Sequence, residues 1–356
     1  MAVIRDPMPA FEFFQPTSIE DAQVLLRRYG ADAWVLAGGL DSLDWLKDRI
    51  RRPEALVDLG SIPGLKGVRE RDGGLEIGAM TTLTELVAHP LVRERYSILL
   101  EAAEAAASPQ IRNQGTIGGN VSQDTRCWYY RAGWPCYRAG GNICYADAPE
   151  SINREHAILH ADRCVAVNPS DTAPALIVLD AQMVIRTANG AERFVPAEEY
   201  FVGPGIDITR MTILAPGDLL TSIRLPATWA ASAQGSGEPG ARFYFEKVRD
   251  RQVWDFALVS VASAMVMTPL RQGSGGQGVI ERMRIAVNGV AARPLRLQAV
   301  ETLVRGRAAD EMTAVAAGNL AIDGAQPLTF NAYKVPLMRN LVKRAIRGVE
   351  PTTWNS

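Results

Sequence analysis

Four cysteines, the whole complement of this 356-residue chain, gather in one stretch. They are Cys127, Cys136, Cys144 and Cys164, separated by 9, 8 and 20 positions. Four thiolates form a soft ligand set, which suits an iron–sulfur cluster or zinc and does not suit magnesium or calcium. Structural zinc sites usually show paired C-x₂₋₄-C knuckles, and this spacing has none. The stretch predicts a [4Fe–4S] cluster, with zinc or free or disulfide-bonded cysteines as alternatives.

The residues around these cysteines support cluster chemistry. Aromatic side chains shield a cluster from water, and glycines free backbone N–H groups to bond to its sulfides. The segment carries both kinds of residue, namely Trp128, Tyr129, Tyr130, Trp134, Gly140 and Gly141. His156 and His160 are possible alternative ligands. Their i, i+4 spacing predicts instead that they lie on a short helix that packs the loop.

Two further stretches contain paired glycines that can approach a phosphate. AGGLDSL (37–43) follows a predicted strand and opens a predicted helix, and TIGGN (116–120) repeats the combination of hydroxyl, glycines and amide. Adjacent glycines let backbone N–H groups meet a phosphate with no Cβ in the way, and a helix N-terminus adds partial positive charge. Asp41 and Ser42 are candidate caps of the first helix. Two tight turns that need positive φ are the structural alternative.

Two other stretches, GSGEPG (235–240) and GSGGQG (273–278), match the dinucleotide fingerprint G-x-G-x-x-G. That fingerprint needs a strand before it and a helix opening on it. The first stretch is the end of a polar, Gly/Pro-rich segment at 227–240 that we interpret as a linker, and the second lies between two predicted strands as a hairpin loop. We therefore expect any dinucleotide to bind at the paired glycines and not in a Rossmann site.

Composition limits the remaining function classes. The chain has 38 Lys and Arg against 39 Asp and Glu, which argues against nucleic-acid binding. Hydrophobic residues make up 47% of 356 residues, enough for two or three domains. We expect no membrane insertion, because no apolar run approaches the ~20 residues that a membrane helix needs. The N-terminus lacks a signal pattern, so we expect a cytoplasmic protein, or a periplasmic one if a partner exports it.

The elements that must position these groups alternate between helices and strands. Thr17 and Glu20 predict a capping box for a helix that ends near Gly30, and further helices are predicted at 43–50, 81–89, 98–108 and in the last 60 or so residues. Strands are predicted at 33–38, 55–60, 75–80, 175–186 and in three segments between 241 and 290. Residues 122–165 are predicted to be irregular.

In this order, these segments resemble the FAD-binding subunit of the molybdenum hydroxylases, the family of xanthine dehydrogenase and carbon monoxide dehydrogenase. The resemblance covers most of the chain. It is carried by FEFFQPTSIEDAQVLL, LAGGLDSL, PEALVDLGSIPGLKGV, IGAMTTLTEL, SPQIRNQGTIGGNV, PSDTAPALIVLDA and FEKVRDRQVWDFALVSVA. Residues 122–165 look like an insertion that also occurs in the flavin subunits of 4-hydroxybenzoyl-CoA reductase and of bacterial aldehyde oxidoreductases, and the second type is the closer match.

The resemblance implies an α+β protein with a vanillyl-alcohol-oxidase (PCMH)-type FAD-binding fold. It implies an FAD-binding subdomain at 1–60, a second at 61–226 with the cysteine-bearing insertion at 122–165, a linker at 227–240 and a C-terminal α+β domain of the CO-dehydrogenase-flavoprotein kind at 241–356.

The resemblance also assigns roles to particular residues. Two loops would hold the FAD diphosphate, and Asp171 would bind a ribityl or ribose hydroxyl. Lys247 would lie near the flavin ring and stabilise its anionic reduced form; a solvated strand lysine is the alternative. The pair Leu40-Asp41 departs from the family pattern and puts the phosphate contact in doubt. The loop residues are Leu36, Ala37, Gly38, Gly39, Leu40, Asp41, Ser42 and Leu43 on one side, and Thr116, Ile117, Gly118, Gly119 and Asn120 on the other.

By resemblance, the chain is an oxidoreductase subunit that carries FAD and a [4Fe–4S] cluster. Its partners would be a molybdenum-cofactor large subunit and a [2Fe–2S] small subunit, and the complex would oxidise aldehydes or hydroxylate an aromatic heterocycle. We find no nucleophile–base pair in the sequence, in keeping with an electron-transfer role. The alternatives are a flavin subunit of the benzoyl-CoA-reductase type, a self-contained FAD oxidoreductase and a zinc-stapled interaction module.

Overall fold

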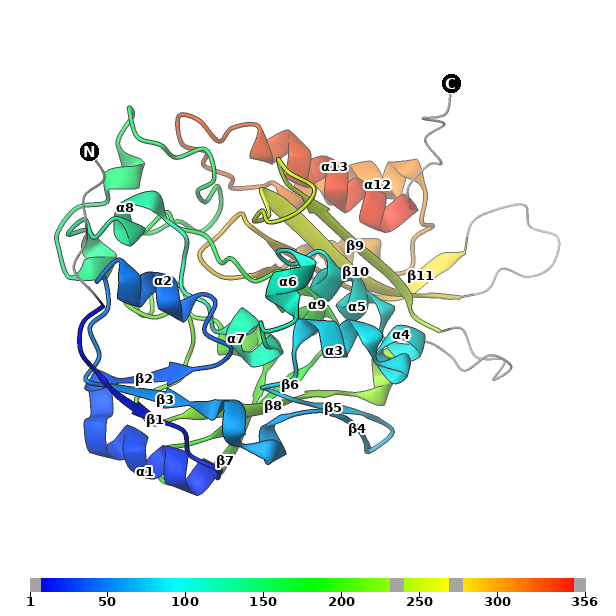
Figure 1. The fold of residues 1–356 in the computed structure, drawn as a ribbon. Helices are drawn as coiled ribbons and strands as arrows, with labels where there is room; N and C mark the ends of the chain where they lie inside the picture. Colours follow the sequence, from blue (N-terminus) through cyan, green and yellow to red (C-terminus); the bar gives the residue numbers. More distant parts are fainter. Residues whose placement is uncertain (1–7, 231–239, 269–277, 349–356) are drawn as a thin grey trace.

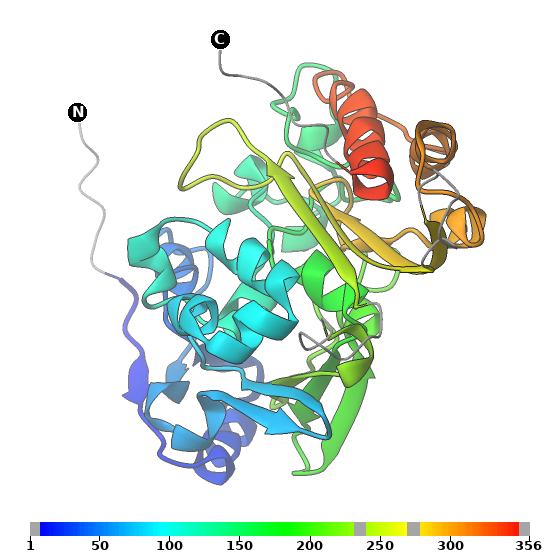
Figure 2. The same ribbon diagram turned by 90° about the vertical axis from the view of Figure 1, so that its right-hand side faces the viewer.

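Three β-sheets organise the part of the chain that the computed structural model describes, residues 8–230, 240–268 and 278–348. Figure 1 shows the first two sheets in the lower half of the molecule and the third above them, beneath the C-terminal helices. Figure 2, turned by 90°, separates the C-terminal part from the rest of the molecule. Helices and strands both contribute throughout, so the predicted α+β class is confirmed.

The first sheet is small, parallel and ordered β1-β3-β2. Strand β3 is buried along Ala55, Leu56 and Val57, as expected for the centre of a parallel sheet. The predicted capping box at Thr17 is wrong, because Ser18 caps the first helix by accepting a hydrogen bond from the Asp21 amide. The elements are β1 (Glu12–Phe14), α1 (Ile19–Tyr29), β2 (Ala33–Leu36), α2 (Ser42–Lys47) and β3 (Ala55–Asp58).

The second sheet is antiparallel, and its strands come from distant parts of the chain. Its order is β4-β5-β8-β6-β7, and the central pairing of β5 with β8 sets Leu75 opposite Leu225. Ile77 and Ile223 point from these two strands into the largest core cluster, which the neighbouring helices also fill. The strands are β4 (Val68–Arg71), β5 (Gly74–Gly78), β6 (Gln182–Arg186), β7 (Glu192–Pro196) and β8 (Leu219–Leu225).

Short helices pack beside this sheet. Thr82 and Glu85 form the capping box of α3. The strand predicted over 175–186 is half wrong: its first part is a fully buried helix, and only the second part is a strand. A continuous apolar run carries no period that separates a buried helix from a buried strand. The helices are α3 (Leu83–Ala88), α4 (Pro90–Arg95), α5 (Ser97–Glu104), α6 (Pro109–Arg112), α7 (Ile117–Val121), α9 (Ala173–Val178) and α10 (Ala197–Tyr200).

The third sheet, ordered β12-β11-β10-β9, has helices on both faces, because α13 packs against β10 in one core cluster and α9 packs against β10 and β11 in another. Strands β10 and β11 pair antiparallel, as expected on either side of the GSGGQG stretch, although residues 269–277 lie outside the described part. Helices α12 and α13 pack together over this sheet (Figure 1). The elements are β9 (Arg242–Val248), β10 (Val259–Thr268), β11 (Val279–Asn288), β12 (Leu295–Arg296), α11 (Gln298–Val304), α12 (Glu311–Ala321) and α13 (Lys334–Arg347).

The cysteine-bearing segment, residues 122–165, is irregular as predicted, apart from α8 (Trp128–Arg131) and single turns. It lies beside α2 and reaches the C-terminal part, where Lys334 Nζ donates to the carbonyls of Glu155, His156 and Gly289. The helix predicted for the two histidines is absent from this segment, since residues 151–160 form turns and bends. His156 is buried and His160 is exposed.

The predicted linker at 227–240 lies only partly within the described residues. Of the predicted linker, residues 227–230 form a short turn that buries Trp229, whereas the GSGEPG stretch lies almost wholly outside the described residues. Across the described ranges, every helix is too short or too polar to cross a membrane.

Candidate functional site

A cavity of about 540 Å³ opens between the two glycine loops. The first loop contributes Ala37, Leu40 and Ser42 to its wall, and the second contributes Gly118 and Asn120. The sequence-predicted loops, 73 or more residues apart in the chain, are therefore neighbours in space.

The first loop presents unpaired backbone donors. Gly38 and Gly39 have φ values of 76° and 80°, and a Cβ on Gly38 would lie 2.3 Å from the Gln114 carbonyl oxygen, so this turn requires glycine. Within the described residues, the N–H groups of Gly38, Gly39, Leu40 and Asp41 donate to no protein acceptor. The loop can therefore offer these N–H groups to an anion at the start of α2.

Ser42 adds a hydroxyl, while Asp41 does not act as predicted. The indole Nε1 of Trp34 donates to Ser42 Oγ at 2.9 Å, which leaves the Ser42 hydroxyl hydrogen for another acceptor. Asp41 occupies the N-cap position, but its side chain makes no capping bond. Its carboxylate instead pairs with Arg126 and Arg131 of the cysteine-bearing segment.

The second loop differs from the first because its backbone donors are already in use. The amide of Ile117 donates to the Thr81 carbonyl, that of Gly118 to Ala79 and that of Gly119 to Thr116 Oγ1. A Cβ on Gly118 would lie 2.7 Å from the Ala79 carbonyl oxygen, so glycine is needed here for close packing. The loop therefore offers a flat backbone surface, and the predicted cradle of free N–H groups is confined to the first loop.

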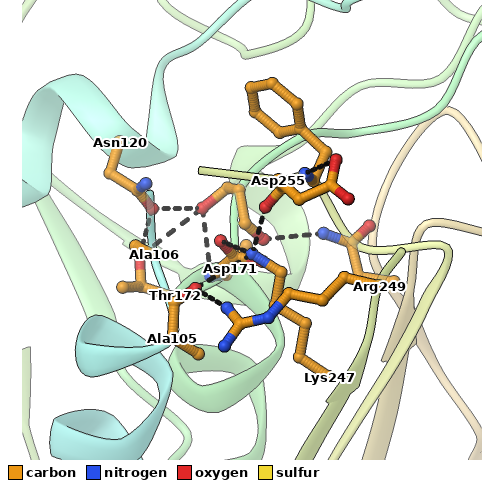
Figure 3. Close-up of polar contacts among 12 residues, drawn as sticks. Ala105, Ala106, Asn120, Asp171, Thr172, Lys247, Arg249 and Asp255 are labelled. Atoms are coloured by element: carbon orange, nitrogen blue, oxygen red, sulfur yellow. Dashed lines mark hydrogen bonds and ion pairs between the residues drawn. The ribbon is translucent and has the colours of Figure 1, made fainter. Parts of the chain in front are cut away.

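The amide side chain of Asn120 is oriented by two hydroxyls. Ser170 Oγ and Thr172 Oγ1 both donate to Asn120 Oδ1 at 2.7 Å (Figure 3). With Oδ1 satisfied, the Nδ2 group is the part of Asn120 left to serve as a donor at the cavity wall.

Asp171 and Lys247 meet at the inner end of the cavity. Lys247 Nζ lies 2.7 Å from Asp171 Oδ2 and also donates to the carbonyls of Ala105 and Asp255 (Figure 3). Burial raises the pKa of Asp171 and lowers the pKa of Lys247, and each partner's charge opposes the other's shift. Asp171 lines the cavity but Lys247 does not, so Lys247 lies behind Asp171. The solvated-lysine alternative is wrong, because Lys247 is buried.

The four cysteines lie in one neighbourhood at the side of the cavity. Burial raises the pKa of Cys127, and the nearby thiols of Cys144 and Cys136 add to that shift. Burial likewise raises the pKa of Cys164 to about 11, with Cys144 and Cys127 among its neighbours. A metal that binds these sulfurs must displace their protons.

Across the described ranges, no three His, Cys, Asp or Glu side chains are grouped closely enough to hold one metal ion. His156 Nε2 contacts Cys127 Sγ at 3.3 Å, which makes it the nearer of the two candidate histidines. The aromatic shield is partial: Tyr129, Trp134 and Tyr145 pack together, while Trp128 is exposed.

Sequence reasoning missed several residues that line the cavity. Arg126 comes from the cysteine-bearing segment, and Trp254, Asp255 and Phe256 come from the turn after β9. These three residues belong to the stretch FEKVRDRQVWDF, in which the sequence analysis identified only Lys247 as a site residue. Arg126 also lines a second, smaller pocket that contains Cys127, so it lies between the cavity and the cysteines.

The fold and cavity define a flavoprotein, and comparison with known families agrees. The model described as "FAD binding domain in molybdopterin dehydrogenase" matches residues 9–228, and the "CO dehydrogenase flavoprotein C-terminal domain" matches residues 243–349. The chain belongs to the family of FAD-binding subunits of molybdenum hydroxylases, and the predicted resemblance and FAD cofactor are confirmed.

Individual relatives match along nearly their whole length. The aldehyde oxidoreductase FAD-binding subunit PaoB of Escherichia coli is 34% identical over 93% of this chain and 96% of its own. The carbon monoxide dehydrogenase medium chain of Hydrogenophaga pseudoflava is 32% identical over 96% of this chain and 97% of its own. A solved carbon monoxide dehydrogenase structure from the same organism matches with a TM-score of 0.72 and 30% identity, covering 96% of this chain and 98% of that chain.

Proposed function

We propose that the two glycine loops hold the diphosphate of FAD, with residues 36–43 on one side and residues 116–120 on the other. The observation that carries this proposal is the row of N–H groups from Gly38 to Asp41, which donate to no acceptor among the described residues and belong to a loop that lines the cavity through Ala37, Leu40 and Ser42. Ser42 Oγ–H and Asn120 Nδ2 supply side-chain donors to the same ligand. The cavity of about 540 Å³ falls within the range of cofactor sites.

Asp171 and Lys247 act as a unit in this proposal. The Asp171 carboxylate accepts a hydrogen bond from a ribityl or ribose hydroxyl of FAD, while Lys247 holds that carboxylate charged and in place. The Lys247 ammonium already has three acceptors, so its influence on the flavin is electrostatic and passes through Asp171. When bound, FAD supplies storage for two electrons that it can release singly or as a hydride.

The cysteines form the second half of the proposal: Cys127, Cys136, Cys144 and Cys164 hold a [4Fe–4S] cluster. Each thiolate of such a cluster binds a different iron, so its sulfurs stand further apart than those around a single ion. The gathering of four thiols in one neighbourhood, at spacings that lack the C-x₂₋₄-C knuckles of structural zinc sites, supports this assignment over zinc. The pocket that joins Cys127 to Arg126 and Phe256 sets this centre beside the flavin cavity.

The chain then serves as the flavin and iron–sulfur subunit of a cytoplasmic three-subunit oxidoreductase. Its partners are a large subunit with the molybdenum cofactor and a small subunit with [2Fe–2S] clusters, and it passes their electrons to an external acceptor. Aldehydes are the proposed substrate class, because the aldehyde oxidoreductase subunit of E. coli matches 96% of its own length to this chain.

Cofactor analysis of the anaerobically purified full chain tests the cofactor assignments. We expect one FAD, four irons and four sulfides per chain, and a low-temperature EPR signal of a reduced [4Fe–4S] cluster. Cys→Ala replacement at Cys136 should remove the iron. A colourless chain contradicts the flavin assignment, while zinc in place of iron, or four freely titratable thiols, contradicts the cluster. Turnover of aldehydes by the assembled complex, with carbon monoxide as the comparison substrate, tests the substrate class.

A further inference from the structure

The wall of the flavin cavity is unexpectedly acidic for a site that receives a diphosphate. Within the described residues, its one basic side chain is Arg126. Its carboxylates are Asp41, Asp44, Asp124, Asp171, Asp218 and Asp255. Like charges repel at close range, so the carboxylates nearest the phosphates need compensation before the ligand can bind.

Asp41 is the carboxylate with the most direct conflict. It belongs to the first glycine loop, and its own N–H is one of the donors left unpaired there. Lys247 compensates Asp171 and Arg138 compensates Asp124 by ion pairs away from this loop. An uncompensated Asp41 would set a negative charge beside the anion that the loop is built to accept.

Both partners of Asp41 come from the cysteine-bearing segment. Arg126 Nη1 and Arg131 Nη2 pair with the same oxygen, Asp41 Oδ1, the second at 2.6 Å. Each guanidinium is held in place by an aromatic ring: Arg126 lies over Phe256 at 4.7 Å and Arg131 over Trp45 at 3.7 Å. The two ion pairs join Asp41 to residues that lie 85 and 90 positions further along the chain.

We propose that Arg126 and Arg131 neutralise Asp41 and thereby make the first glycine loop able to bind the FAD diphosphate. The inference rests on the proposed function, because it takes this loop as the diphosphate site. Both arginines are positioning residues, since they act through Asp41. The cysteine-bearing segment is then a part of the flavin site, and Cys127 lies between its two arginines in the chain.

A double-mutant cycle on FAD affinity tests this inference. FAD is titrated into the full-length apoprotein and binding is followed by flavin fluorescence. We expect R126Q to weaken binding about tenfold or more, because it exposes the Asp41 charge. D41N keeps the backbone N–H of Asp41 and removes its charge, so it should bind FAD at least as tightly as the unaltered chain. It should raise the FAD affinity of R126Q by a larger factor than it raises that of the unaltered chain. Charge removal at Asp41 rescues the arginine loss only if neutralisation is the role of Arg126.

Variants at Arg131 provide a second test in case R126Q fails to fold. Arg131 does not line the cavity, and R131Q combined with D41N should show the same rescue. Arg154 of the same segment forms a matched but exposed pair with Asp250, which follows β9, and R154Q and D250N should leave FAD affinity unchanged. If R126Q binds FAD like the unaltered chain, or if D41N gives no rescue, the inference is wrong.

A glycine variant separates this inference from the proposed function. A side chain at Gly119 would meet the Ala37 carbonyl at 3.1 Å and Thr116 Oγ1 at 3.0 Å, so G119V should weaken FAD binding whatever the state of Asp41. An unaffected G119V would overturn the assignment of the loops. If G119V weakens FAD binding but D41N fails to rescue R126Q, the role of the arginines alone is overturned.

Discussion

Lys247 and Asp171 form a buried ion pair that joins strand β9 to the segment before α9. Their charged atoms lie 2.7 Å apart, and the two side chains are 2% and 6% exposed. The three acceptors around Lys247 Nζ belong to three separate stretches, at Ala105, Asp171 and Asp255. One ammonium group therefore fixes the inner end of the flavin cavity to the C-terminal part of the molecule.

The first prediction concerns this pair. K247M leaves a buried carboxylate without its cation and should lower the free energy of unfolding by about 3–5 kcal/mol, as measured by urea denaturation. The double variant D171N/K247M should lose less unfolding free energy than K247M, because it contains no buried carboxylate without a cationic partner. K343M removes a partly exposed lysine from its pair with the exposed Glu311 and should cost less than about 1 kcal/mol of unfolding free energy. Equal losses in K247M and K343M would contradict the prediction.

The second prediction concerns Lys334, which donates to three backbone carbonyls. Burial lowers the pKa of Lys334 from its ordinary 10.5 to about 7. Between these values the unfolded chain holds the proton more tightly than the folded chain, so the unfolding free energy should rise with pH. The slope should approach about 1.4 kcal/mol per pH unit between roughly pH 7.5 and 9.5.

Two variants isolate the contribution of Lys334. K334M should be less stable at all pH values and should lose this slope in denaturant titrations, because it has no proton to bind. K66M changes an exposed lysine and should keep the slope of the unaltered chain. A K334M chain that retains the full slope would show that another group carries it.

The third prediction concerns the turn of the first glycine loop. G38A puts a Cβ at positive φ and 2.3 Å from the Gln114 carbonyl oxygen. The backbone strain should cost about 1–3 kcal/mol, and the displaced loop should release FAD, which absorbance of the desalted protein will report. G64A meets no atom within 4 Å and should keep its flavin. A fully yellow G38A chain would count against this loop as a flavin contact.

The fourth prediction concerns the anchoring of the cysteine-bearing segment. Arg138 is buried and bonds to Asp124 Oδ1 through Nη2 at 2.6 Å and to the Ile208 carbonyl at 2.8 Å. R138M removes these bonds and leaves Asp124 with the more distant Arg51, at 3.7 Å, as its cationic partner. Residues 122–165 should therefore become sensitive to limited proteolysis, and the free energy of unfolding should fall by about 3 kcal/mol. Arg163 is an exposed residue of the same segment, and R163M serves as the control. Identical cleavage rates for the two variants would refute the anchoring role.

Local features of the sequence predicted local structure well. The positive φ values of Gly38 and Gly39 and the helix predicted at 81–89, which is α3, depend on neighbouring residues, so short motifs identify them. The family, its flavin cofactor and the α+β class also follow from ordered motifs along the chain. Where two local solutions compete, short motifs fail: Ser18 caps α1 in place of the adjacent Thr17.

The sequence by itself determined the glycine turns, most strands and helices, and the clustering of the cysteines along the chain, because each depends on residues close in sequence. Tertiary structure alone decided that Asp41 pairs with Arg126 and Arg131, that Lys247 is buried behind Asp171, and that the run 173–178 is a helix. These outcomes depend on which distant segments pack together, and neither the identity of a residue nor its local spacing encodes the charges and surfaces that it will meet there.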